Sequence, residues 1–236
     1  MTNDFANSSV GTKMLSRRTA ALAGGWGVIV MTVFYFFAEL FVFQRLLVPG
    51  DTLATAENIL ANESLFRIGI LGFVIVIVCD IIVAWAFYFL FKPTSNALSL
   101  LSAWFRLVYS VIFLVALFNY LKVLELLGEA LTSEVVLAIT ESIESFGKEW
   151  SLGFVFFGIH LTLLGYLSLK SKDIPKIMGV LLLIAGIGYL INTVLQFIDP
   201  EFNHLIFQMT GWGELIFVLW LLFVGIKQID WTQHKI

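Results

Sequence analysis

The chain has 236 residues, of which 59% are hydrophobic and only 13% are charged, with a formal net charge of −3 and a mean hydropathy of +0.94. Soluble domains usually carry about 25% charged residues, so the composition excludes an ordinary soluble protein and favours one membrane bundle. The weak negative charge, without a basic cluster among aromatic residues, predicts no nucleic acid partner.

The first apolar segment follows a basic stretch. Lys13, Arg17 and Arg18 precede an apolar run that continues from Ala20 to Val48. This run is far longer than the apolar core of a signal peptide. We therefore expect a first membrane helix here, with residues 1–18 as a cytoplasmic tail.

Six segments reach the length of about 20 apolar residues that spans a bilayer. They cover approximately residues 20–47, 67–91, 97–121, 150–169, 175–197 and 205–227. Turn-forming residues separate them, as at Pro49-Gly50 and Pro93. We predict an all-α polytopic membrane protein, a bundle of six transmembrane helices within a single membrane domain over residues 1–236.

The long connection between Leu124 and Glu149 has an apolar residue at every fourth position. This spacing predicts an amphipathic helix in an outer loop, broken near Thr132-Ser133. It is either a lid over an outward-facing cavity or a connector whose apolar stripe packs on the bundle or membrane surface. The connector is favoured because the leucines of any connector need an apolar surface.

Lysine and arginine are distributed unevenly between the two sides of the predicted bundle. With a cytoplasmic N-terminus, nine of them lie on the cytoplasmic side and four on the other. This asymmetry predicts an N-in/C-in protein of the cell (cytoplasmic) membrane, with the lipid bilayer as its partner. The oligomeric state is not predicted.

Five ionisable side chains fall inside the apolar segments, where charge is costly. They are Glu39, Asp80, Arg106, His160 and Glu214. Asp80 precedes the turn over residues 92–96 by twelve residues, and Arg106 follows it by ten. Both therefore lie roughly 15–18 Å from the turn on antiparallel neighbours. We expect them to form an ion pair, which either fixes the helix register or takes part in function.

Two stripes of small and polar residues are expected to face the interior. One consists of Ser99, Ser102, Arg106 and Ser110, and the other of Ala185, Gly188, Asn192 and Gln196. Each stripe is either a packing surface or part of a ligand path, and packing is the favoured interpretation of each.

The remaining polar residues suggest a pocket. Counting along the spans places Glu39 and Glu214 in the outer half, near Asn192 and above Asp80, Arg106 and His160. Two acids with one fixed positive charge favour a protonated carboxylate, as in proton-coupled transport or a cationic ligand site. His160 is either a satisfied interior histidine or part of a proton relay.

We predict no metal, no cofactor and no catalytic residue. A lone histidine cannot supply the three or four ligands of a zinc or non-haem iron site. The chain also lacks a Gly-x-Ser-x-Gly elbow, an HExxH motif and a CxxC motif.

Several segments together resemble a known family. They are Pro49-Gly50-Asp51-Thr52, Phe91-Lys92-Pro93, Gly165-Tyr166-Leu167 and Ile174-Pro175, together with the spans of Asp80 and Arg106. The chain resembles, over almost its whole length, the bacterial integral membrane family catalogued as domain of unknown function 4386. The resemblance implies a bacterial cytoplasmic membrane protein and carries no activity or site residues.

The leading hypothesis is therefore a membrane protein that binds or passes a small solute or proton through the interior polar cluster. The alternative is a structural or accessory scaffold whose buried polar residues only hold the helices together. An intramembrane enzyme comes third.

Overall fold

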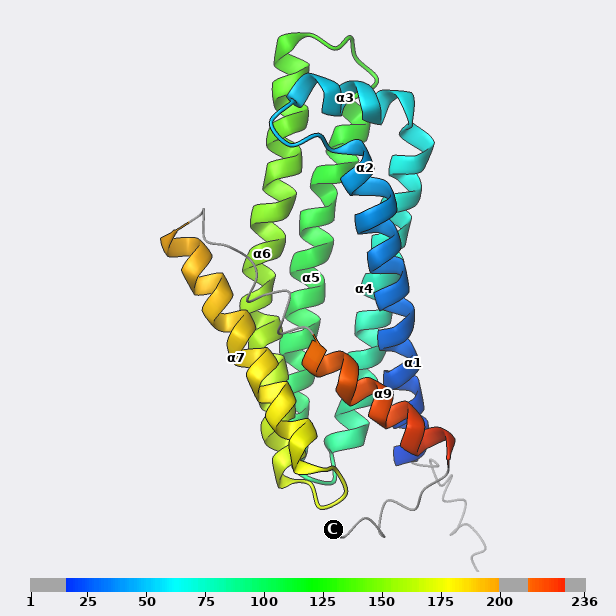
Figure 1. The fold of residues 1–236 in the computed structure, drawn as a ribbon, viewed down its shortest axis with the longest axis vertical. Coiled ribbons are helices and arrows are strands. Elements are labelled where there is room, and N and C mark those ends of the chain that lie inside the picture. Colours follow the sequence, from blue (N-terminus) through cyan, green and yellow to red (C-terminus); the bar gives the residue numbers. More distant parts are fainter. Residues whose placement is uncertain (1–15, 200–211, 228–236) are drawn as a thin grey trace, which may run out of the picture.

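The computed structural model describes residues 16–199 and 212–227, and every regular element in these ranges is a helix (Figure 1). In chain order the elements are α1 (Arg17–Phe36), the π-helix η1 (Phe37–Phe43), α2 (Gln44–Leu46), α3 (Thr52–Ala61), α4 (Glu63–Phe91), α5 (Asn96–Leu126), α6 (Ser133–Lys170), α7 (Lys176–Ile198) and α9 (Trp212–Ile226). The chain is therefore all-helical over the described residues, as the sequence predicts.

Five helical segments of the described chain are long and apolar enough to cross a membrane. They are Arg17–Leu46, Glu63–Phe91, Asn96–Leu126, Ser133–Lys170 and Lys176–Ile198. The sixth predicted span, 205–227, corresponds to the shorter apolar helix Trp212–Ile226. Residues 205–211 lie outside the described residues, as does most of the predicted tail over residues 1–18.

The long helices stand side by side, and α9 crosses two of them. Helix α4 packs against α1 and α5, α5 packs against α6, and α6 packs against α7. Helix α9 packs against α1 and α7, closing the bundle over its lower half (Figure 1, red). The predicted hairpin between α4 and α5 is present, with Ser95 as the N-cap of α5. We call the end of the bundle that holds Arg17, Lys92, Lys170 and Lys227 the basic end.

One element differs from the prediction. The amphipathic segment and the fourth span form one continuous helix of 38 residues, α6, rather than two helices. Thr132 caps its N-terminus, so the predicted break is the start of the helix. The apolar stripe, including the fully buried Ile139, lies in the part of α6 that continues the bundle wall toward α3 and α5. This position fits the connector interpretation.

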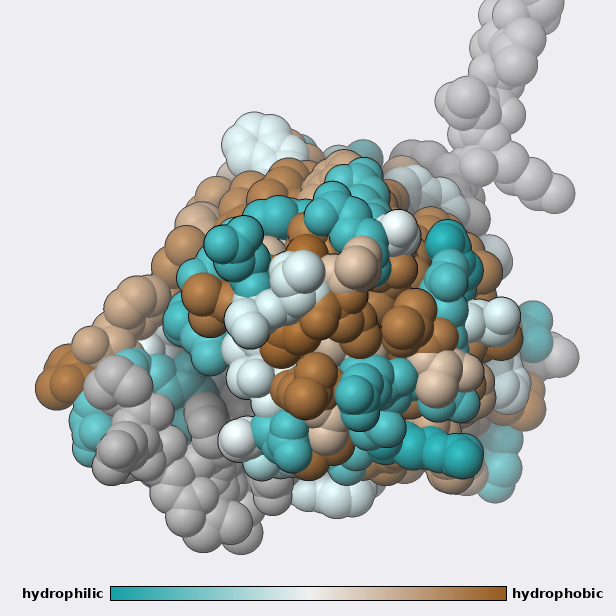
Figure 2. Space-filling view, turned by 90° about the horizontal axis from the view of Figure 1, so that it is seen from above, coloured by the Kyte–Doolittle hydropathy of each residue, from teal (hydrophilic) through white to brown (hydrophobic). Residues whose placement is uncertain are grey.

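The lateral surface of the bundle is apolar. Val33, Leu71 and Val111 are 60%, 60% and 58% exposed. Exposed apolar residues along whole helices are expected where lipid tails replace water. Figure 2, which looks down on the α3 end, shows hydrophilic residues around a hydrophobic centre, so the polar surface at this end is concentrated at its periphery.

The contact between α6 and α7 depends on glycine. A Cβ atom added at Gly186 would lie 2.6 Å from the backbone nitrogen of Thr162 and 2.7 Å from the carbonyl oxygen of Gly158. The two backbones therefore approach more closely than any side chain permits. This is the packing device expected between apolar helices in lipid.

Candidate functional site

Arg106 is the centre of a buried charged network. It lies on the inward face of α5, and its side chain is fully buried. Its Nε donates to Asp80 Oδ1 on α4 at 2.8 Å, and Nη2 lies 2.7 Å from the same oxygen. The ion pair expected from the α4–α5 hairpin is therefore present.

Three further acceptors complete the surroundings of the guanidinium. Nη1 donates to Glu214 Oε1 on α9 at 2.8 Å and lies 3.1 Å from His160 Nε2 on α6. Nη2 also donates to the Met31 sulfur on α1 at 3.6 Å. A guanidinium has five N–H groups, and these contacts use all five. Side chains from α1, α4, α6 and α9 thus converge on one residue of α5.

The hydrogen bonds of His160 define its tautomer. Its Nδ1 lies 2.9 Å from the backbone carbonyl oxygen of Ser102, which can only accept, so Nδ1 carries the proton. Nε2 is then unprotonated and accepts from Arg106. The imidazole is neutral in this arrangement, because a protonated ring would place a second cation against the guanidinium. His160 is the satisfied interior histidine of the simpler interpretation.

The network holds more acid than base. Asp80 and Glu214 are two carboxylates, Arg106 is one cation and His160 is neutral, so full ionisation would leave a net charge of −1. Asp80 is 1% exposed and Glu214 is 7% exposed. The rings of Phe87 and Phe157 lie 5.9 and 5.3 Å from the Arg106 guanidinium carbon. An uncompensated charge in such surroundings is costly, which favours one proton on the two carboxylates.

The network lies at one depth in the bundle. Asp80 and His160 are eleven and ten residues before the ends of α4 and α6 at the basic end, and Arg106 is ten residues after the start of α5. Glu214 is twelve residues before the end of α9. For α4, α5 and α6, which run along the bundle, these separations correspond to roughly 15–17 Å from the basic end. Helix α9 is oblique (Figure 1), and its 2.8 Å contact with Arg106 brings Glu214 to the same level. The expected placement of Glu214 in a separate outer pocket with Glu39 was therefore wrong.

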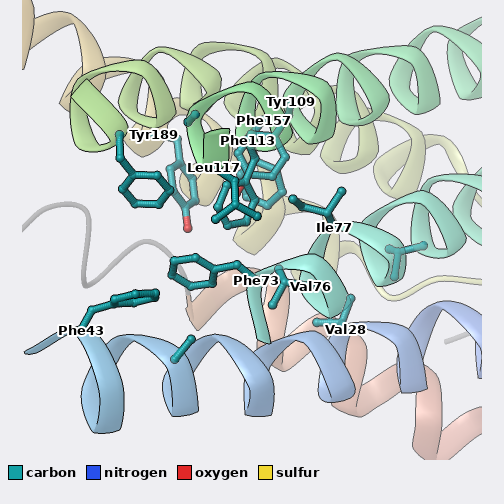
Figure 3. Packing of buried hydrophobic residues seen from close by; sticks show 14 of the residues in the cluster. Val28, Phe43, Phe73, Val76, Ile77, Tyr109, Phe113, Leu117, Phe157 and Tyr189 are labelled. Atoms are coloured by element: carbon teal, nitrogen blue, oxygen red, sulfur yellow. The ribbon is translucent and has the colours of Figure 1, made fainter. Parts of the chain in front are cut away.

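Glu39 lies outside the network. It belongs to η1, eight residues beyond Met31, or about 12 Å farther from the basic end. Phe73 and Phe113, which pack in the interior (Figure 3), are each seven residues farther from the basic end than Asp80 and Arg106, so they lie between the two levels. The rings of Phe73 and Phe113 are 5.2 Å apart, and Phe113 stacks on Trp150 at 4.8 Å. An apolar aromatic layer thus separates Glu39 from Arg106.

Asn192 lies near the network without bonding to it. It is 1% exposed, and its Oδ1 has no hydrogen-bond partner among the described residues. Asn192 is one turn along α7 from Tyr189, whose ring lies 5.1 Å from that of Phe157. Gln196, the other polar residue of the α7 stripe, joins two helices, because Ser151 on α6 donates to its side-chain oxygen at 2.6 Å.

The serine stripe of α5 faces inward as expected. Ser99, Ser102 and Ser110 are buried, and Ser110 donates to the Arg106 carbonyl oxygen at 3.0 Å. Met31 was not anticipated as a neighbour of Arg106, because a methionine in an apolar span has no distinguishing pattern. Within residues 16–199 and 212–227, His, Cys, Asp and Glu side chains form no group of three suited to a metal ion.

Comparison with known proteins places the chain in a family without an assigned activity. The sequence profile described as "domain of unknown function (DUF4386)" matches residues 23–225. An uncharacterized protein of Archaeoglobus fulgidus is 36% identical over 158 residues, which are 67% of this chain and 84% of the relative. No solved structure matches. The Arg106 network must therefore be interpreted from its own geometry.

Proposed function

Since this chain belongs to the DUF4386 family, whose description assigns no activity, we propose from its geometry an integral membrane protein that binds an exchangeable proton at the Arg106 network and passes that proton, or a small solute coupled to it. The observation that carries the proposal is the sharing of one buried guanidinium by two carboxylates from different helices, Asp80 and Glu214. A single carboxylate would suffice to neutralise Arg106.

Glu214 makes the weaker of the two carboxylate contacts with the guanidinium. Asp80 receives two contacts from the guanidinium and its side chain is 1% exposed, whereas Glu214 receives one contact and its side chain is 10% exposed. Glu214 also lies on α9, which packs mainly on α1 and α7. Protonation of Glu214 removes its negative charge from the contact with Arg106, so it weakens the attachment of this helix to the network.

Infrared spectroscopy of the protein in lipid tests the proton. A protonated carboxyl group has a carbonyl stretch that is separate from the bands of carboxylate and amide groups. We expect this band at neutral pH in the unmodified protein and its loss in both Glu214→Gln and Asp80→Asn, because either substitution leaves one carboxylate for one guanidinium. A spectrum without the band, or a band that survives either substitution, would overturn the proposal of a shared proton.

Exchange into D2O tests whether the proton can move. If the network is part of a path, its carboxyl band shifts soon after transfer to D2O, because water reaches the site when the bundle opens. The matched control is Glu39→Gln, which removes a carboxylate outside the network and leaves both the band and its exchange unchanged.

A scaffold role is the second candidate, and one observation favours it. All five N–H groups of Arg106 already have acceptors, and the network joins four helices to α5. A buried network of this kind can serve register and helix order alone. In that case the carboxyl band of the network would remain unshifted in D2O until the protein unfolds.

A further inference from the structure

A second polar site lies at the basic end of the bundle. The turn between α4 and α5, the start of α1 and the turn between α6 and α7 surround a cavity of about 630 Å³. Its polar lining includes Arg17, Thr94, Ser95, Lys170, Lys172 and Asp173. This cavity is separate from the Arg106 network, which lies roughly 15 Å deeper in the bundle.

The lining of the cavity has a positive charge. Three cations and one acid, Asp173, line it, so the formal charge is 3 − 1 = +2. Arg17 forms an ion pair with Asp173, which holds the guanidinium at the cavity wall. Lys170 lies 5.6 Å from the centre of the Tyr166 ring. Neither Lys170 nor Lys172 has an acidic partner among the described side chains, so their charges remain for a ligand.

The neighbouring Lys176 has a different role. Its Nζ donates to the backbone carbonyl oxygens of Leu169 and Ser171, the latter at 3.0 Å. Lys176 thus satisfies carbonyl groups at the end of α6, where a cation is favourable. Lys170 also lies in the last turn of α6, but neither it nor Lys172 donates to a carbonyl oxygen among the described residues.

The start of α5 adds donors to the cavity. Ser95 caps this helix of 31 residues, and its Oγ accepts from the Leu98 backbone N–H at 3.4 Å. The N-terminus of a long helix carries a partial positive charge and unpaired N–H groups that favour an anion. Two lysine ammonium groups, the hydroxyl groups of Thr94 and Ser95 and this helix end thus face one cavity.

We propose that this cavity binds a phosphate group, carried either by the headgroup of an anionic phospholipid or by a soluble phosphate. The position of the cavity favours the lipid source. It lies at the end of the apolar helices, and Tyr166, 44% exposed, and Leu98 are part of its lining. Basic pockets between membrane helices recognise lipid headgroups in this way. This proposal does not depend on the function of the Arg106 network.

The test measures binding of a fluorescent phosphatidylglycerol to the full chain purified in neutral detergent. Phosphatidylcholine is the reference lipid, and inorganic phosphate is the soluble competitor. The variant is Lys170→Gln/Lys172→Gln, in which both substitutions are at exposed positions. The control is Lys122→Gln/Lys148→Gln, which makes the same change of charge at the opposite end of the bundle.

We expect phosphatidylglycerol to bind more tightly than phosphatidylcholine, and the Lys170/Lys172 variant to bind it about 30-fold more weakly, from the contribution of two lysines near a headgroup. The control variant should bind as the unmodified protein does. Displacement by millimolar inorganic phosphate would support the cavity as a site for soluble phosphate, and resistance to displacement would support the lipid. Equal binding of the two lipids, or unchanged binding in the Lys170/Lys172 variant, would overturn the proposal.

Discussion

The double substitution Asp80→Asn/Glu214→Gln should destabilise the protein by much more than the sum of the two single substitutions. Each single substitution leaves one carboxylate opposite Arg106, so the network keeps a counter-ion. The double substitution removes both carboxylates and leaves a guanidinium without a counter-ion in the network, although its hydrogen-bond acceptors are still present. The effect therefore isolates the need for charge compensation from the need for hydrogen bonds.

The magnitudes follow from the contacts. In each single variant, one ion pair with Arg106 is replaced by a hydrogen bond from the guanidinium to a neutral amide oxygen, so the attraction between opposite charges is lost at that contact. We expect each to lower the free energy of unfolding by about 1 kcal/mol. An uncompensated charge left in a buried pair costs about 3–5 kcal/mol. The double variant should therefore exceed the sum of the single effects by about 2 kcal/mol, which is within the range measured for coupled residues.

The assay is reversible unfolding in mixed micelles, with sodium dodecyl sulfate as the denaturant and tryptophan fluorescence as the signal. The control is Glu63→Gln/Glu144→Gln, which removes two exposed carboxylates that pair with Arg67 and Lys148. Such pairs contribute little, and this control should be additive within about 0.5 kcal/mol. Additive losses for Asp80→Asn and Glu214→Gln would refute the shared-guanidinium argument.

Three other predictions concern the fold. Gly186→Ala should lower the thermal midpoint and cost about 1–3 kcal/mol because the added methyl group meets the α6 backbone, whereas Gly147→Ala, which meets nothing within 4 Å, should leave the midpoint unchanged or raise it. His160→Leu removes an acceptor from Arg106 and should cost about 1–3 kcal/mol in the same unfolding assay, and an unchanged stability would contradict the assigned hydrogen bond. Asp51→Ala removes the N-cap of α3 and should weaken that helix by about 1 kcal/mol, seen as faster amide hydrogen exchange in α3 but not in α5.

The membrane helices and the Asp80–Arg106 pair follow from local features of the sequence. Apolar runs of sufficient length define the spans, and a tight turn places two antiparallel helices in contact. Residues equally far from one turn must then lie at equal depth. The same argument places His160 at the level of Arg106, because both lie ten residues from the basic end. That count does not reveal which faces of the helices meet.

The prediction placed Glu214 at the wrong depth. It assumed an upright span over residues 205–227 and therefore placed Glu214 nearer the outer surface. The described helix α9 instead crosses the bundle obliquely (Figure 1), and Glu214 pairs with Arg106 at 2.8 Å. Apolar composition does not determine the tilt of a helix, so this level could not be counted from the sequence.

The sequence by itself determined the all-helical class, the apolar spans and the one ion pair across a short turn, because each depends on residues close together in the chain. Only the tertiary structure decided that Met31, His160 and Glu214 join that pair and that Glu39 does not. The reason is that helix rotation and crossing depend on the packing of all the helices together, including the glycine contacts between them. A guanidinium whose five N–H groups all have acceptors is a property of that packing. It changes a simple ion pair into a site with one carboxylate more than its charge requires.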